Sequence, residues 1–106
     1  MPFDVIDKNA YEEAEPGSIH LVERDIVAIQ TEFEFFPTRQ VGFVRTFRLN
    51  DRYLELFSND NAYYFVKYSH IYSDPLRPTL RIREYHYFRC DQIYELKDCI
   101  KHIANM

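Results

Sequence analysis

The sequence has 106 residues, of which 46% are hydrophobic and 17% aromatic, and it carries a net charge of −4. That length supports one hydrophobic core and is too short for two, so we predict a single domain over residues 1–106. No stretch approaches the roughly eighteen apolar residues of a membrane span, and the opening MPFDVIDK lacks the pattern of a signal peptide. We therefore expect a soluble cytoplasmic protein without membrane contact. Its two glycines exclude a glycine-rich phosphate loop.

Charge is divided unevenly along the chain. Residues 1–36 carry nine acidic side chains against Lys8 and Arg24, a local charge of −7. Residues 37–90 carry nine basic and five acidic side chains, a local charge of +4. Opposite charges on neighbouring strands stabilise a sheet, so the two parts are expected to neutralise each other in the fold. The alternative is a basic binding surface in the second part.

The first eighteen residues are predicted to form an acidic N-terminal arm that ends at the turn-forming pair Pro16 and Gly17. Asp7 is placed to cap a helix of about two turns, which is too short to be stable unless it docks. Over residues 25–36 apolar and polar side chains alternate. This alternation predicts a strand with Val27 and Ile29 on the same face.

Further strands are predicted at residues 40–49, 52–57, 62–72 and 79–90, with turn-forming residues between them. Residues 91–104 place Ile93, Leu96, Ile100 and Ile103 at helical spacing after the potential cap Asp91. The predicted fold class is therefore α+β. We expect an antiparallel, twisted sheet of about five strands at 19–90, open or curled into a half-open barrel. One C-terminal helix at 91–104 packs on it, and the short arm at 1–18 precedes it.

The last predicted strand contains the run RIREYHYFR at residues 81–89. Alternation assigns one set of side chains to the helix side, namely Ile82, Glu84, His86 and Phe88. It assigns the other set to the outer side, namely Arg81, Arg83, Tyr85, Tyr87 and Arg89. In a structural interpretation, Arg81 and Arg83 pair with acids of neighbouring strands such as Glu32 and Glu34. In two functional interpretations, the outer row contacts a protein, or Tyr85, Tyr87 and Tyr68 stack on single-stranded nucleic acid.

Signals for catalysis or for a metal are weak. Glu84 and His86 are close enough for an acid–base partnership, although a satisfied polar contact is the commoner arrangement. His86, Cys99 and His102 could converge if the helix folds back over the last strand, but buried thiols are usually core residues. Cys90 and Cys99 are predicted to lie about 13 Å apart along a helix, beyond disulfide reach. Because no catalytic motif is present, we predict no enzyme activity, no metal and no cofactor.

The sequence therefore favours a small non-enzymatic protein-binding or regulatory domain, of the inhibitor or accessory type that phages and mobile elements encode. It would act through the acidic arm or through a sheet face. The binding residues predicted on that face are Arg81, Arg83, Tyr85, Tyr87, Arg89 and Tyr68. The partner is expected to be another protein or a second copy in a homodimer. The alternative is a single-stranded nucleic-acid-binding protein that uses the same face.

Overall fold

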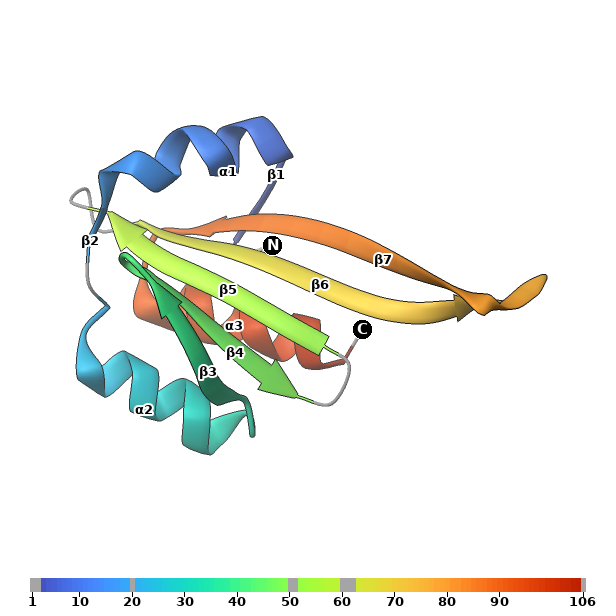
Figure 1. Ribbon diagram of the computed structural model, residues 1–106. Coiled ribbons are helices and arrows are strands. Elements are labelled where there is room, and N and C mark those ends of the chain that lie inside the picture. The colour runs from blue at the N-terminus through green and yellow to red at the C-terminus, as the bar shows by residue number, and fades with distance from the viewer. Residues whose placement is uncertain (1–2, 20, 50–51, 60–62, 106) are drawn as a thin grey trace.

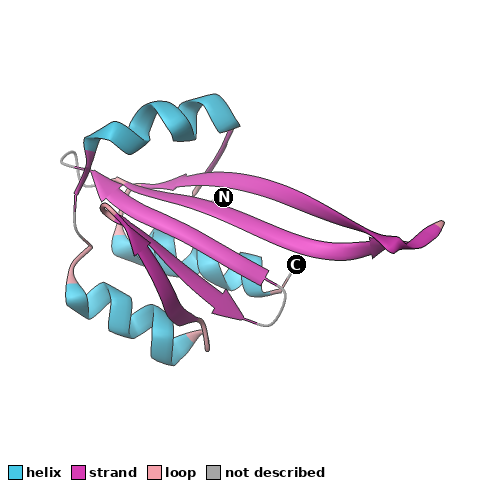
Figure 2. Ribbon diagram, viewed as in Figure 1, coloured by secondary structure: helices cyan, strands magenta, loops and turns pink. Residues whose placement is uncertain are grey.

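The structure is a computed structural model that describes residues 3–19, 21–49, 52–59 and 63–105 (Figure 1). Helices and strands alternate in the first third of the chain, and strands then follow one another up to a C-terminal helix (Figure 2). In chain order the elements are β1 (Asp4–Ile6), α1 (Lys8–Ala14), the 3-10 turn η1 (Glu15–Gly17), β2 (Ser18–Ile19), α2 (Glu23–Glu32), β3 (Phe36–Val41), β4 (Val44–Leu49), β5 (Arg52–Asn59), β6 (Tyr64–Asp74), β7 (Arg77–Cys90) and α3 (Ile93–Ala104).

The strands form one antiparallel sheet in the order β1-β7-β6-β5-β4-β3, and β2 adds to the end of β5. The sheet is open, because β1 and β3 lie at its opposite edges. The α+β class and the C-terminal helix that packs on the sheet are confirmed. The described residues form more strands than the five predicted and three α-helices, of which α2 was not expected.

The predicted strand at 25–36 is wrong, because most of this segment is the helix α2. Ile26 and Ile29 are three residues apart and both buried, whereas Val27, which a strand would place beside Ile29, is exposed. The acidic residues Glu23 and Asp25 lie in the first turn, where the helix dipole favours negative charge. The segment satisfies both periodicities, and packing of the helical face against the sheet decides between them.

The N-terminal arm is docked onto the sheet, which its short helix requires for stability. β1 pairs with the end of β7, with Asp4 opposite Arg89. The carboxylate of Asp7 accepts a hydrogen bond from the backbone N–H of Ala10 at 2.8 Å, which confirms Asp7 as the helix cap. Tyr11 of α1 is buried on the sheet, so this short helix is held by tertiary packing.

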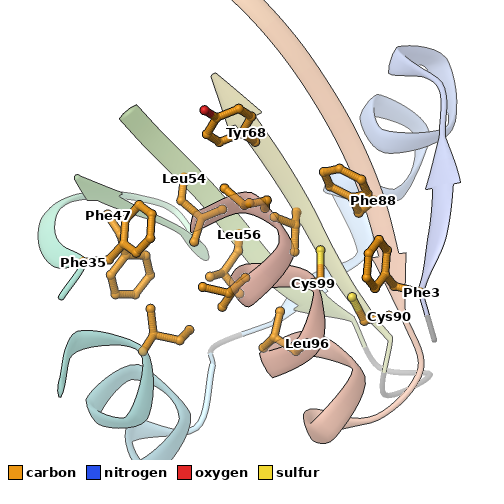
Figure 3. Packing of buried hydrophobic residues seen from close by; sticks show 14 of the residues in the cluster. Phe3, Phe35, Phe47, Leu54, Leu56, Tyr68, Phe88, Cys90, Leu96 and Cys99 are labelled. Atoms are coloured by element: carbon orange, nitrogen blue, oxygen red, sulfur yellow. The ribbon is translucent and has the colours of Figure 1, made fainter. Parts of the chain in front are cut away.

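The main hydrophobic core fills the space between one face of the sheet and the helices α2 and α3 (Figure 3). Leu96, Ile100 and Ile103 of α3 enter it, as the helical spacing predicted. The cap of this helix is Gln92, however, and not Asp91. The carboxylate of Glu95 stabilises the first turn, because it accepts hydrogen bonds from the backbone N–H groups of Asp91 and Gln92 at the start of the helix.

The two thiols lie in this core and contact each other, so the predicted separation is wrong. Cys90 ends β7, the chain turns at residues 91–92, and α3 then runs back beneath the sheet and brings Cys99 to the same place (Figure 3). Both are buried and reduced. A hydrogen bond with Cys90, reinforced by burial, raises the pKa of the Cys99 thiol far above its ordinary value. The predicted distance was measured along one helix axis that included Cys90, whereas Cys90 ends the strand and the helix turns back on it.

Candidate binding surface

The second face of the sheet is covered at one end only. There α1 packs over a small separate core made by Tyr11, Val44, Phe57 and Phe65. No described helix covers the rest of this face, and Figure 1 shows the sheet continuing well past the end of α1. Directly opposite residues of neighbouring strands share a face, so the strand register identifies what is exposed there.

We name this uncovered region the bare strip. Its central row runs across five strands, because Phe36 is opposite Arg48, Arg48 opposite Tyr53, Tyr53 opposite Ser69, and Ser69 opposite Tyr85. The bare strip comprises the large side chains of this row and their neighbours, namely Phe36, Arg48, Tyr53, Glu55, Lys67, Arg83 and Tyr85. Ser69 is buried beneath them.

Cations and rings alternate across the bare strip and hold each other in place. The guanidinium groups of Arg48 and Arg83 each lie 5.6 Å from the centre of the Tyr53 ring. The ammonium group of Lys67 lies 4.9 Å from the centre of the Tyr85 ring and 4.0 Å from the carboxylate of Glu55. Such cation–π contacts contribute about 0.5–1 kcal/mol each at exposed sites. The cations and rings of this surface therefore contact one another in the absence of a partner.

Only part of the predicted Arg/Tyr row belongs to this surface. Tyr85 is 46% exposed, and Arg81 and Arg83 are also exposed. Tyr87 instead packs under α1, with its ring centre 5.3 Å from that of Tyr11, and burial raises its pKa. Arg89 donates a hydrogen bond to Asp4 at 2.7 Å, which raises the pKa of its guanidinium. Tyr87 and Arg89 therefore anchor α1 and β1.

Two details of the predicted row are wrong. Tyr68 is opposite His86 and so belongs to the face that α3 covers, where it is only 2% exposed. It cannot stack on a ligand together with Tyr85. Glu32, expected beside Arg81 or Arg83, lies on α2 and pairs with Lys97 of α3 at 3.6 Å. Both errors came from register and topology, which alternation within one strand does not determine.

Five residues of the bare strip were missed at the sequence level: Phe36, Arg48, Tyr53, Glu55 and Lys67. The available signal was the turn-forming pair at 50–51, because a hairpin about that pair places Leu49 opposite Arg52 and Arg48 opposite Tyr53. The turn does not identify Lys67, since the position of Lys67 on this face of the sheet depends on how β5 and β6 are aligned.

The bare strip continues into a protruding ribbon formed by residues 71–83. β5 accompanies β6 only as far as His70, and β1 pairs with β7 only at residues 87–89, so within the described residues the ribbon strands pair only with each other. Figure 1 shows the ribbon reaching away from the rest of the molecule. Arg81 and Arg83 lie on its bare-strip side. At its tip Leu76 is 90% exposed, and its backbone N–H is held by the Asp74 carboxylate at 2.9 Å.

The predicted acid–base pair lies on the opposite side of this ribbon. The carboxylate of Glu84 accepts a hydrogen bond from the Tyr72 hydroxyl at 3.0 Å, which raises the pKa of that hydroxyl. His86 Nε2 is farther from the carboxylate, at 3.9 Å, and its ring packs on Tyr68 with 5.7 Å between ring centres. The closest contact of Glu84 is thus structural: it joins β6 to β7 at the base of the ribbon.

The side chains considered for a metal site are kept apart by their surroundings. Cys99 is buried in the core, whereas His102 is exposed and packs against the rings of Phe3 and Phe88. Within the described ranges, no group of three or more His, Cys, Asp or Glu side chains could hold a metal ion. Two shallow depressions of about 330 and 320 Å³ lie beside β3 and β4, and the first adjoins the bare strip through Phe36 and Arg48.

Comparisons with known proteins add no functional constraint. The chain matches no protein-family model, and neither curated proteins nor solved structures show significant similarity to it. None of the helices in the described part of the chain is long and apolar enough to cross a membrane.

Proposed function

We propose that the protein is a small, non-enzymatic, cytoplasmic binding or regulatory protein that docks its bare strip onto a protein partner. The observation that carries this proposal is the ordered row of cations and rings on a sheet face that no described helix covers. Tyr and Arg are enriched at the energetically dominant positions of protein interfaces. Because these side chains already contact one another, they lose less conformational entropy on binding than isolated side chains would.

The biological role that fits such a surface is that of an inhibitor or accessory protein, including those of phages and mobile elements. Two further features support an interaction role. The ribbon offers a long two-stranded arm with an exposed apolar tip at Leu76. Over the same face of the sheet, α1 and the start of η1 expose the carboxylates of Glu12, Glu13 and Glu15. These give the face both signs of charge, which favours recognition of a particular partner.

Single-stranded nucleic acid is the competing ligand, and it has less support. A stacking platform needs several neighbouring rings on one accessible face. The exposed rings of the bare strip, Phe36 and Tyr85, lie at opposite ends of its central row, and Tyr53 between them contacts two guanidinium groups. Of the three tyrosines predicted to form that platform, Tyr68 is in the core and Tyr87 is packed under α1. Binding to labelled oligonucleotides at low salt, weakened as salt rises, would favour this competitor over the proposal.

The proposal is tested by placing a photo-crosslinking amino acid at Tyr85 and, as a matched control, at Tyr94 on α3. Both are exposed tyrosines, at 46% and 60%, on opposite faces of the molecule. Crosslinking in cells that produce the protein should give a discrete protein adduct from position 85 only. Adding Arg83→Glu should remove this adduct. No adduct at position 85, or the same adducts from both positions, would contradict the proposal.

A further inference from the structure

The face that carries the bare strip is stepped. The helix α1 rests as a ridge over Phe57, Phe65 and Tyr87, at one end of three neighbouring strands. The bare strip begins two residues along the same strands, at Glu55, Lys67 and Tyr85. Two residues of strand span about 7 Å, so the ridge and the bare strip adjoin each other directly. The molecule therefore presents a raised half and a lowered half side by side.

The two halves carry opposite charges of equal size. Residues 7–15, which cap and form α1 and begin η1, hold four acidic side chains against Lys8, a charge of −3. The bare strip and the ribbon together hold five basic side chains, Arg48, Lys67, Arg77, Arg81 and Arg83, against Glu55 and Asp74, a charge of +3. A partner that neutralises both halves would thus present an acidic ridge to the bare strip of this molecule and a basic hollow to its helix α1. This same face of a second copy meets that description.

Resting on the proposed function above, we propose that the partner of the bare strip is a second copy of this chain. The two copies meet α1 face to α1 face about a two-fold axis, so that the acidic ridge of each fills the bare strip of the other. A two-fold interface uses the same patch on both molecules, so every favourable contact occurs twice. The axis passes between the bare strip and the edge of α1. Each ribbon then extends along the partner's α1 and brings Arg81 toward its carboxylates.

The same arrangement disfavours other occupants of this face. A nucleic acid that follows the bare strip approaches α1, and the net charge of −3 on residues 7–15 disfavours phosphate there. An unrelated protein would have to supply an acidic ridge of matching height. A second copy supplies the ridge and the hollow together.

The test is a charge swap measured by sedimentation velocity of the full chain, over about 1 µM to 1 mM at low and high salt. One variant carries Arg81→Glu and Arg83→Glu, and the other carries Glu12→Lys and Glu13→Lys. Each variant alone should dimerise at least about tenfold more weakly than the wild type. An equimolar mixture should recover wild-type affinity as a heterodimer, because both of its interfaces regain opposite charges. The matched control, Lys97→Glu with Lys101→Glu on α3, should dimerise as the wild type does.

Three results would overturn this inference. The first is a wild-type protein that stays monomeric throughout the concentration range. The second is a dimer whose affinity the two variants leave unchanged, because it would then use another surface. The third is retention of a labelled oligonucleotide by the monomer at low salt. If the protein stays monomeric while position 85 still crosslinks to another protein, the proposed function stands with a different partner. If position 85 gives no adduct either, both fail.

Discussion

The helix α1 is attached to the sheet by a single buried aromatic side chain, and this predicts an unusual pair of mutational effects. The Tyr11 ring packs against Phe57 and Tyr87, with ring centres 5.2 and 5.3 Å away. Its hydroxyl is buried and has no hydrogen-bond partner among the described residues. Burial, together with the nearby carboxylate of Glu55, raises the pKa of Tyr11 well above 10. The ring should therefore stabilise the fold while the hydroxyl opposes it.

The two contributions can be separated by substitution. Tyr11→Phe keeps the ring and removes a buried polar group whose desolvation costs about 1–3 kcal/mol, so we expect a gain of about 1 kcal/mol in the free energy of unfolding. Tyr11→Ala removes the ring and leaves a cavity, for which a loss of about 3–5 kcal/mol is expected. For a domain of this size, the first change should raise the melting temperature by about 4 °C or more.

Urea denaturation followed by circular dichroism measures both values, and an unchanged dependence on urea would show that the unfolded state is unaffected. A Tyr11→Phe protein less stable than the wild type by about 1 kcal/mol would show that the hydroxyl does have a partner. A Tyr11→Ala protein as stable as Tyr11→Phe would show that α1 is not anchored through this ring. Either result would refute the reasoning.

Three other predictions concern the core and the ribbon. The Tyr64 hydroxyl donates to Asp25 at 3.1 Å, and burial followed by that charge raises its pKa to about 12. Its folded pKa lies above the unfolded value of 10, so its stabilising contribution is complete below pH 10 and is lost as the pH rises to about 12. Absorbance at 295 nm should show this late ionisation, and Asp25→Asn should shift it toward pH 10; an unshifted titration would argue against the hydrogen bond. Cys90 and Cys99 should resist a thiol reagent in the native protein and both react in urea, whereas rapid native labelling would contradict their burial. Leu76→Asp at the ribbon tip should change the free energy of unfolding by less than about 0.5 kcal/mol, and a larger loss by thermal melting would show that the tip packs on something.

The elements that the sequence predicts well are those with one long, unambiguous periodicity. The strand that ends at Cys90 and the helix that contains Leu96 and Ile100 are examples. The segment 25–36 failed because Ile26 and Ile29 fit a helical face while Val27 and Ile29 fit a strand face. No local feature of this segment favours the helix clearly over the strand. Contact of Ile26 and Ile29 with the main core, which is a long-range effect, decides it.

The candidate binding surface was predictable only in part for a similar reason. The alternation in residues 81–89 does identify Arg83 and Tyr85 as facing away from the C-terminal helix. It does not reveal that α1 covers Tyr87, because that depends on how a seven-residue helix docks through Tyr11. Nor does it place Tyr68 on the opposite face from Tyr85, since this requires the register between two strands. The face on which a side chain lies can be inferred within one strand. Which helix covers that face, and how neighbouring strands are aligned, depend on contacts between elements.

The most direct test of the bare strip as the surface through which two copies associate is a dilution series of the isotopically labelled protein followed by nuclear magnetic resonance. The surface described here predicts that amide signals of Tyr53, Lys67 and Tyr85, and those of Glu12 and Glu13 on α1, shift together with concentration, while signals of α3 stay fixed. Shifts confined to α3 or to the free edge of β3, or no shifts up to about 1 mM, would contradict it.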